Sequence, residues 1–417
     1  MNKAYLILAD GTVFEGNSIG AQGKTIGEVV FTTGMTGYLE TLTDPSYFGQ
    51  IVTQTFPLIG NYGVIPEDFE SARSWVRGYI VREMCDGPSN FRCKGNLDDF
   101  LKAQNIVGIC GIDTRALTKK LRESGVMNGM IVSGKDSSTV ISENTNVISV
   151  LDTEIFNEIK EYTITDAVKS VSRKEKGEPV LPVFASQKLE AQAEKNLGKN
   201  TAKACAIAPE AISKHVALFD FGAKANIQRE LEKRGCKVTV VPYNTTAQEI
   251  INLNPDGIML SNGPGDPAEN TGVIAEIRKL CEWNKKIVES SSTMTNHVIP
   301  IFGICLGHQM LALARGAKTS KLKYGHRGGN HPCKDLLTNR VYITSQNHGY
   351  AVEPASLPPQ ARLSFINVND NTCEGIEYTD IPAFSVQFHP EACGGPHDTN
   401  FLFDRFLKMM EAPSATK

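Results

Sequence analysis

The fold of this chain is decided by one segment, residues 298–309, which reads VIPIFGICLGHQ. The apolar run at its start predicts a buried strand, and residues 306–314 predict a helix. Gly303 and Gly307 flank Cys305, and a Gly-x-Cys-x-Gly turn between strand and helix is typical of a nucleophile elbow with cysteine in place of serine. The glycines permit a tight, strained turn, and the thiol would lie at a helix N-terminus, where the dipole favours the thiolate. A reactive cysteine is therefore predicted, with an inert buried cysteine as the alternative.

The alternation of strand and helix extends over residues 215–410. Short apolar runs and amphipathic segments predict strands over 215–220, 237–242 and 257–261, and helices over 225–234, 247–252 and 271–283. Because the connections are short, the pattern predicts an α/β fold with a doubly wound, mostly parallel sheet. Ligands bind such sheets at the carboxyl ends of the strands, where Cys305 lies. The stretch over residues 284–296 predicts a surface insertion.

The first 150 residues predict a separate domain of mixed α+β structure. Asp10-Gly11 between two apolar runs is a strong hairpin signal. Helices are expected over residues 98–104 and 113–122, the second with Asp113 as its N-cap.

The chain is expected to divide into four parts: an N-terminal domain over 1–150, a linker with a polar insertion over 151–214, the α/β domain over 215–410, and a tail over 411–417. From residue 166 the linker is polar, with charges of both signs. This composition predicts a solvated connector with at most one exposed helix and no core element.

Composition excludes several classes of protein. The chain has 417 residues, which fits two or three domains, and a net charge of -3, which lacks the basic excess of a general nucleic-acid binder. Its ten cysteines form no C-x-x-C pair, so a zinc ribbon or thioredoxin-like motif is not expected. No signal peptide, transit peptide or apolar run of membrane-spanning length occurs, and we expect a cytoplasmic protein.

A cysteine nucleophile needs a base, and the segment SVQFHPE at 385–391 supplies one. His389 and Glu391 are two residues apart on an extended segment, so both can face the same side. His389 would take the thiol proton, and Glu391 would orient the imidazole. The backbone N–H groups of Leu306 and of Gly263, in the turn SNGPGDP at 261–267, would stabilise an oxyanion, with Gly265 allowing close substrate approach.

Together these motifs resemble the class I, triad-type glutamine amidotransferases. Further segments are similar to the small subunits of carbamoyl phosphate synthetases: FTTGMTGY at 31–38, LTDPSY at 42–47, GNYG at 60–63, GIDTR at 111–115, FDFGAK at 219–224, GGNHP at 328–332 and SQNHGYAV at 345–352. The resemblance covers nearly the whole chain apart from the linker and the 284–296 stretch.

The resemblance implies a glutamine-hydrolysing subunit that passes ammonia through an internal tunnel to a large synthetase subunit. That partner would use ATP, Mg and bicarbonate, while this chain would hold no cofactor. The implied nucleophile, base and orienting carboxylate are Cys305, His389 and Glu391. The implied glutamine-contacting residues are Ser46, Gly263, Gly265, Leu306, Gln309, Asn347, Gly349 and Tyr350. Because Ser46 belongs to the first domain, the pocket is expected near the domain interface.

Two other readings remain open: a stand-alone cysteine hydrolase of γ-glutamyl bonds, and a non-catalytic scaffold that gates ammonia or regulates a synthetase. Oligomeric state, effectors and pathway, pyrimidine or arginine, are also left open. No metal site is expected, because the spacing of His326, His331 and Cys333 fits no standard zinc pattern. Cys393, near His397, lacks an elbow. No P-loop motif occurs, so we expect no ATP site of that kind.

Overall fold

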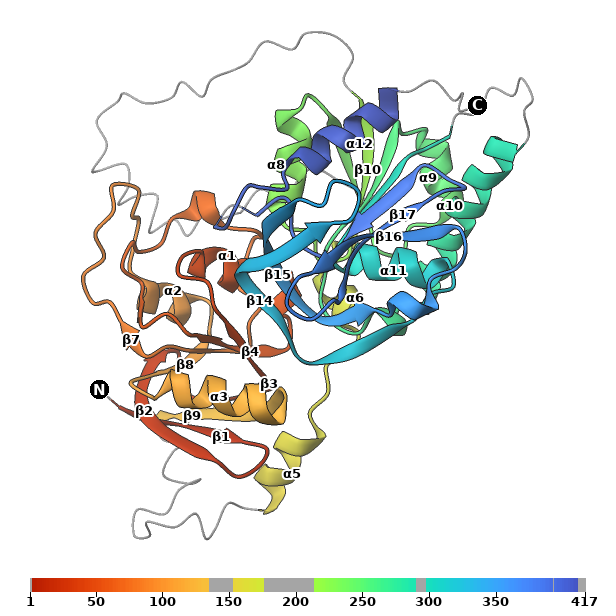
Figure 1. The fold of residues 1–417 in the computed structure, drawn as a ribbon. Helices are drawn as coiled ribbons and strands as arrows, with labels where there is room; N and C mark the ends of the chain where they lie inside the picture. Colours follow the sequence, from red (N-terminus) through yellow and green to blue (C-terminus); the bar gives the residue numbers. More distant parts are fainter. Residues whose placement is uncertain (1, 135–152, 176–213, 290–297, 393, 412–417) are drawn as a thin grey trace, which may run out of the picture.

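The computed structural model describes residues 2–134, 153–175, 214–289, 298–392 and 394–411 (Figure 1). The predicted tail after Glu411, most of the linker (176–213), the stretch 290–297 and Cys393 lie outside the described residues. None of the described helices is both long and apolar enough to cross a membrane.

Seven strands of the N-terminal part close into a barrel in the order β1-β2-β8-β6-β4-β3-β9. Their bounds are β1 (Lys3–Leu8), β2 (Val13–Gly20), β3 (Lys24–Thr32), β4 (Gln50–Gln54), β6 (Gly78–Ile80), β8 (Val107–Cys110) and β9 (Met127–Ser133). The predicted hairpin is confirmed, because β1 and β2 pair across Asp10-Gly11. The closed barrel was not predicted: parallel pairs such as β3 with β4 and β4 with β6 bring together strands separated in sequence.

Short helices cover this barrel. The helix α3 (Thr114–Ser124) begins where predicted, with the Asp113 carboxylate accepting the N–H of Ala116 at 3.0 Å. The other elements are α1 (Tyr38–Thr43), η1 (Pro45–Tyr47), β5 (Leu58–Ile59), η2 (Pro66–Asp68), β7 (Glu83–Met84) and α2 (Leu97–Ala103). A buried cluster that includes Tyr38, Phe69 and Phe100 packs these elements against the barrel.

The second part is a nine-stranded sheet in the order β11-β10-β12-β13-β18-β17-β16-β14-β15. Its parallel half contains β11 (Lys237–Pro242), β10 (His215–Asp220), β12 (Gly257–Leu260), β13 (Ile301–Ile304) and β18 (Ala383–Val386). The predicted α/β alternation is therefore confirmed. The other half is antiparallel and was not predicted: β17 (Cys373–Tyr378), β16 (Ala361–Asn367), β14 (Thr319–Asp335) and β15 (Val341–Val352).

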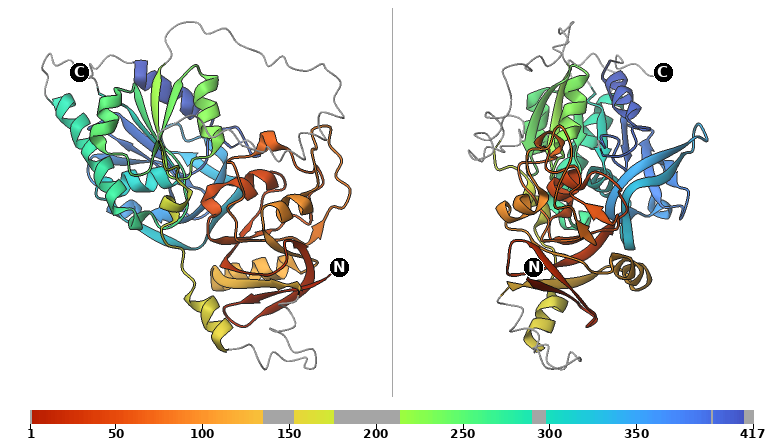
Figure 2. Two further views of the ribbon diagram at one scale, coloured as in Figure 1. Left: turned by 180° about the vertical axis from the view of Figure 1, so that it is seen from behind. Right: turned by 90° about the vertical axis from the view of Figure 1, so that its left-hand side faces the viewer.

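Helices cover both faces of the parallel half, as Figure 2 shows from behind. One face packs against α9 (Ala247–Leu253), α10 (Thr271–Glu289) and α11 (Leu306–Ala314) through side chains such as Phe219 and Ile277. The opposite face packs against α8 (Ala225–Lys233) and α12 (Phe401–Glu411) through Leu218, Phe302 and Phe403. Successive residues of β10 point to opposite faces, and both faces are covered, which is why residues 216–219 of this strand are all apolar. Two short turns, η4 (Pro267–Glu269) and η5 (Pro354–Ser356), complete the part.

Two expectations about the connecting segments are wrong in part. The linker from residue 166 was expected to hold no core element, but Val168 of α6 (Ala167–Val171) is part of the main core; α5 (Thr153–Glu161) precedes it. The stretch 284–296 was expected to be a surface insertion, but its first residues, to Glu289, belong to α10, and the rest lies outside the described residues. Asn284 is buried, and its side chain donates to the carbonyl of Ile299 at 2.8 Å. In both segments, contacts with distant parts of the chain, made by Val168 in the core and by Asn284 with Ile299, fix the structure although the local sequence is polar.

Candidate functional site

The elbow places its strain on the cysteine itself. Cys305 joins β13 to α11 with φ 53° and ψ −104°, a conformation that non-glycine residues rarely adopt. Its N–H donates to the carbonyl of Val386 at 2.9 Å, and the residue is 2% exposed. The flanking glycines serve close packing instead: a Cβ on Gly307 would lie 2.3 Å from the carbonyl oxygen of Leu260. The helix can therefore begin directly against β12, which aims the thiol at the end of the sheet.

His389 and Glu391 form a buried imidazole–carboxylate pair near Cys305. Nδ1 of His389 is 2.6 Å from Oε1 of Glu391, and neither side chain is exposed. Nε2 of His389 has no hydrogen-bond partner among the described residues, which leaves it available for a proton transfer. Burial and the Lys224 cation would lower the pKa of His389, but Glu391 and the neighbouring Cys305 raise it to about 10.

A buried cation, which the sequence analysis did not assign, holds this pair. Nζ of Lys224 is 3.5 Å from Oε1 of Glu391 and 3.5 Å from Oδ2 of Asp44 in the N-terminal part. Burial would raise the pKa of Glu391, but His389 and Lys224 hold it below its ordinary value. A signal was available, because Lys224 and Asp44 are charged residues inside two of the quoted motifs, FDFGAK and LTDPSY.

Asp44 ties the N-terminal part to the wall of the site. Its Oδ2 accepts a hydrogen bond from Nδ2 of Asn347 at 3.1 Å, and its Oδ1 caps η1 by accepting the N–H of Ser46 at 2.9 Å. The Ser46 hydroxyl in turn accepts from Nδ2 of Asn262 at 2.9 Å. The bonds to Asn347 and Asn262 cross between the two parts of the chain, and Ser46 therefore reaches the site from the first part.

The two expected oxyanion donors lie side by side. Leu306 is the first residue of α11, and Gly263 follows β12; a Cβ on Gly263 would lie 2.8 Å from Cδ2 of Leu306 and 2.2 Å from the carbonyl oxygen of Phe221. Only glycine fits there. Neither N–H, of Leu306 or of Gly263, has a hydrogen-bond partner within the described part of the chain. Two adjacent free N–H groups can stabilise a developing negative charge on oxygen.

A cavity of about 440 Å³ opens over Cys305. Seven of the eight expected substrate-contacting residues line it: Ser46, Gly263, Gly265, Gln309, Asn347, Gly349 and Tyr350. The eighth, Leu306, directs its side chain into the core, so its backbone N–H is the group left for the site. Gln309 is held in place because its Nε2 donates to the carbonyl of Tyr350 at 2.7 Å and to Gln387 at 2.9 Å. The volume suits a ligand of amino-acid size.

Charged residues that the sequence analysis missed also line the cavity. Arg327 is 5% exposed, and its Nη1 donates to the carbonyl of Tyr324 at 2.7 Å. Burial lowers the pKa of Arg327, but an arginine side chain remains protonated in proteins. Glu28 lies on the same cavity, where Lys321 and Gln50 hold its carboxylate at 2.6 Å and 2.9 Å. Groups of both signs suit a substrate that carries an ammonium and a carboxylate.

Other residues considered from the sequence lie elsewhere. His397 is exposed. Cys333 is buried on β14, with its Sγ near Thr344 and Gln346, and does not line the cavity. His331 stacks on His326 with ring centroids 5.2 Å apart.

Both parts of the chain match known protein families. Residues 6–131 match the family model described as carbamoyl-phosphate synthase small chain, CPSase domain, and residues 217–409 match that of the class-I glutamine amidotransferases. The chain is 48% identical over 406 residues to a carbamoyl phosphate synthase small chain of Clostridium perfringens, covering 97% of this chain and 99% of that protein. It is 47% identical over 413 residues to the one of Fusobacterium nucleatum subsp. nucleatum, covering 99% of both chains. The small chain of Listeria monocytogenes is 46% identical over 412 residues, covering 98% of this chain and 97% of that protein.

Proposed function

Because this chain belongs to the carbamoyl phosphate synthase small chain family, we propose that it hydrolyses L-glutamine and delivers the ammonia to a large synthetase subunit. The observation that carries this proposal is the strained Cys305, which opens into a cavity lined by seven of the expected glutamine-contacting residues. The chain is the amidotransferase component of such an enzyme.

The reaction begins with the Cys305 thiolate attacking the side-chain amide carbon of glutamine. The N–H groups of Leu306 and Gly263 donate to the oxyanion of the tetrahedral intermediate. Protonated His389 gives its proton to the departing ammonia, which leaves a thioester on Cys305. His389 then takes a proton from water as the water oxygen attacks the thioester carbon, and the product is released with the Cys305 thiolate and protonated His389 restored.

Glu391 supports both proton transfers by holding Nδ1 of His389 at 2.6 Å, so that Nε2 remains the nitrogen that exchanges protons. In the cavity, Asn347, Gly349 and Tyr350 would bind the α-amino and α-carboxylate groups of glutamine, and Gln309 and Ser46 would bound its side chain. The large subunit would use ATP, Mg and bicarbonate to convert the ammonia to carbamoyl phosphate. This chain itself would need none of these cofactors.

The test is glutamate release from glutamine, first by the purified chain and then with a large synthetase subunit, ATP and bicarbonate. We expect low release alone and a strong rise with the partner. Cys305→Ala should abolish glutamine-dependent synthesis and leave ammonia-dependent synthesis intact. Cys281→Ala is the matched control, because Cys281 is fully buried in α10 and does not line the cavity.

Three outcomes would overturn the proposal. Loss of both activities in a folded Cys305→Ala variant would make Cys305 structural. No glutamate release with a reduced Cys305 and the partner present would favour the non-catalytic scaffold. Rapid hydrolysis of γ-glutamyl peptides without any partner would favour the stand-alone hydrolase.

A further inference from the structure

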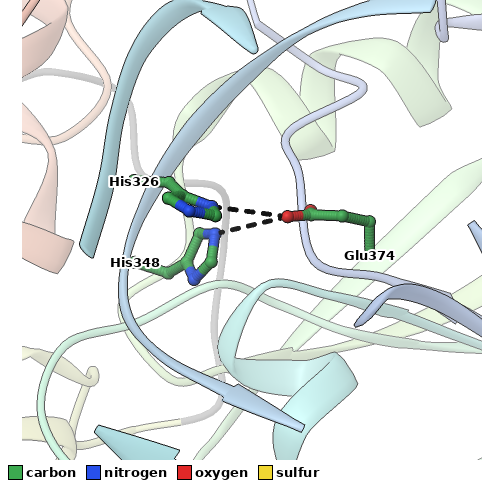
Figure 3. A group of neighbouring side chains, drawn as sticks. All are labelled: His326, His348 and Glu374. Atoms are coloured by element: carbon green, nitrogen blue, oxygen red, sulfur yellow. Dashed lines mark ion pairs between the residues drawn. The ribbon is translucent and has the colours of Figure 1, made fainter. Parts of the chain in front are cut away.

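A second group of ionisable side chains lies in the antiparallel half of the sheet. His326 of β14, His348 of β15 and Glu374 of β17 converge there, and we refer to them as the His326 cluster (Figure 3). Oε1 of Glu374 is 3.4 Å from Nδ1 of His326 and 3.9 Å from Nε2 of His348, and the three atoms lie within 4.8 Å of one another. All three residues are buried. The sequence spacing gave no hint of this set, because it joins three strands.

The outer nitrogen of each histidine already has a partner. Nε2 of His326 is 2.8 Å from Oδ2 of Asp370, and Nδ1 of His348 is 2.8 Å from the carbonyl oxygen of Tyr350. A carbonyl can only accept, so His348 carries its proton on Nδ1. Its Nε2 then turns a lone pair toward Oε1 of Gln346, 3.2 Å away, and toward the Glu374 carboxylate. Metal-binding histidines are held in the same way, with a carboxylate or a backbone carbonyl on the outer nitrogen.

The Glu374 carboxylate is the most deeply buried acidic group of the cluster. Glu374 is 0% exposed, and its Oε2 has no hydrogen-bond partner among the described residues. Asp370 adds a second carboxylate, while Thr372 and Asn367 donate to Oε1 of Glu374 at 3.3 Å and 3.5 Å. Burial of an unbalanced carboxylate is costly. A dipositive ion among neutral imidazoles and the two carboxylates would balance the charge and separate the facing lone pairs.

We propose that the His326 cluster binds a Zn²⁺ ion through Nδ1 of His326, Nε2 of His348 and a carboxylate oxygen of Glu374. Two imidazoles and one carboxylate are a donor set that suits Zn²⁺, which binds four ligands in tetrahedral geometry. Zn–N and Zn–O bonds of about 2.0–2.1 Å place neighbouring ligand atoms roughly 3.3 Å apart, so small side-chain rotations would close the present set around the ion. A water molecule would complete the tetrahedron.

The ion would brace the wall of the cavity over Cys305. His326 and His348 are direct partners in the β14–β15 ladder, and the register shifts on both sides of this pair. Asn347, Gly349 and Tyr350 surround His348 on β15 and line the cavity. A cross-link to β17 would hold this irregular segment in one geometry. An effect on glutamine binding rests on the proposed function, whereas metal binding itself does not.

The test measures metal binding directly. The full chain carries Cys305→Ser, because a thiolate beside His389 could bind zinc itself. It is treated with a chelator, dialysed and titrated with Zn²⁺, and separately with Co²⁺, whose visible spectrum reports tetrahedral coordination. We expect about one ion per chain. Glu374→Gln should weaken binding more than about 100-fold, and Asp370→Asn about 10–100-fold. Glu353→Gln, just after β15, is the control and should bind as tightly as the parent.

Each outcome of this experiment either supports or refutes zinc binding by the His326 cluster. Absence of stoichiometric binding by the folded parent would overturn the proposal and leave the cluster as an ion-pair network. Equal affinity in folded Glu374→Gln would also overturn it. If Glu374→Gln does not fold, a zinc-edge anomalous map of the parent crystal decides: a peak between His326, His348 and Glu374 supports the site, and its absence refutes it. Because the readout is metal binding, it stands even if the glutaminase assay fails.

Discussion

Replacement of Lys224 by Met tests whether one buried cation holds the site together. Lys224 is 8% exposed and lies 3.5 Å from carboxylate oxygens of both Asp44 and Glu391. Burial alone would lower the pKa of Lys224, but Asp44, Glu391 and Glu70 hold it above its ordinary value. The side chain is therefore positively charged at neutral pH. Met keeps most of its volume and removes the charge.

The expected loss of stability follows from these two contacts. At an effective dielectric of about 20, unit charges 3.5 Å apart attract each other by about 5 kcal/mol, most of which is offset by the cost of desolvation. Removing one partner leaves the other charges buried and unpaired. We therefore expect Lys224→Met to lower the free energy of unfolding by about 3–5 kcal/mol. An exposed lysine, Lys237 of β11, provides the matched control. Lys237→Met should change the free energy of unfolding by less than about 0.5 kcal/mol.

The substitution Lys224→Met should also lower the glutaminase rate. Without Lys224, the pKa of Glu391 rises and the carboxylate loses one of the two contacts that place it beside His389. We expect the glutaminase kcat to fall roughly 10–100-fold, as when a catalytic group is displaced by about 1 Å. Urea unfolding measures the stability, and glutamate release with the large subunit measures kcat and KM.

A double-mutant cycle with Asp44→Asn tests whether Lys224 and Asp44 interact. Asp44→Asn removes one of the carboxylates that Lys224→Met leaves unpaired, so the double variant should be more stable than the sum of the two losses by about 1–3 kcal/mol. Additive losses within about 0.5 kcal/mol would show that the two side chains do not interact. A Lys224→Met variant as stable as the parent would refute the argument altogether.

Two further predictions concern packing and pH. Gly307→Ala should destabilise the chain by about 1–3 kcal/mol and sharply reduce glutamate release, since its Cβ would lie 2.3 Å from the Leu260 carbonyl oxygen and push α11 off β12. Gly272→Ala, in open space in α10, should be neutral or slightly stabilising, and equal unfolding midpoints for the two variants would contradict this account. Burial, with Glu70 and Asp68, raises the pKa of Glu40 from 4.5 to about 7. The folded chain therefore binds this proton more tightly than the unfolded chain, and this group's contribution to stability falls as the pH rises from about 4.5 to 7. Relative to the parent, Glu40→Gln should gain up to about 3 kcal/mol between pH 5 and pH 8 in urea unfolding; a pH-independent difference would count against it.

The sequence by itself was enough for the features that depend on neighbours along the chain. The strand, turn and helix around Cys305, the hairpin at Asp10-Gly11 and the Asp113 cap are set by residues within one or two turns of each other. Local periodicity and turn chemistry therefore predicted them correctly. The family motifs also named seven residues that line one cavity: Gly263 and Gly265 follow the parallel strand β12, whereas Asn347, Gly349 and Tyr350 belong to the antiparallel strand β15.

Only the tertiary structure decided which distant groups meet. Lys224 lies between Asp44 and Glu391, and His326 meets His348 and Glu374, through pairings between strands or between the two parts of the chain. Barrel closure and the burial of α6 depend on the same long-range contacts. The free energy of these contacts comes from burial and from charge pairing across space, whose strength depends on strand register and on distance. Strand register and the distance between remote residues do not follow from the sequence of any single segment, so local patterns could not predict these contacts.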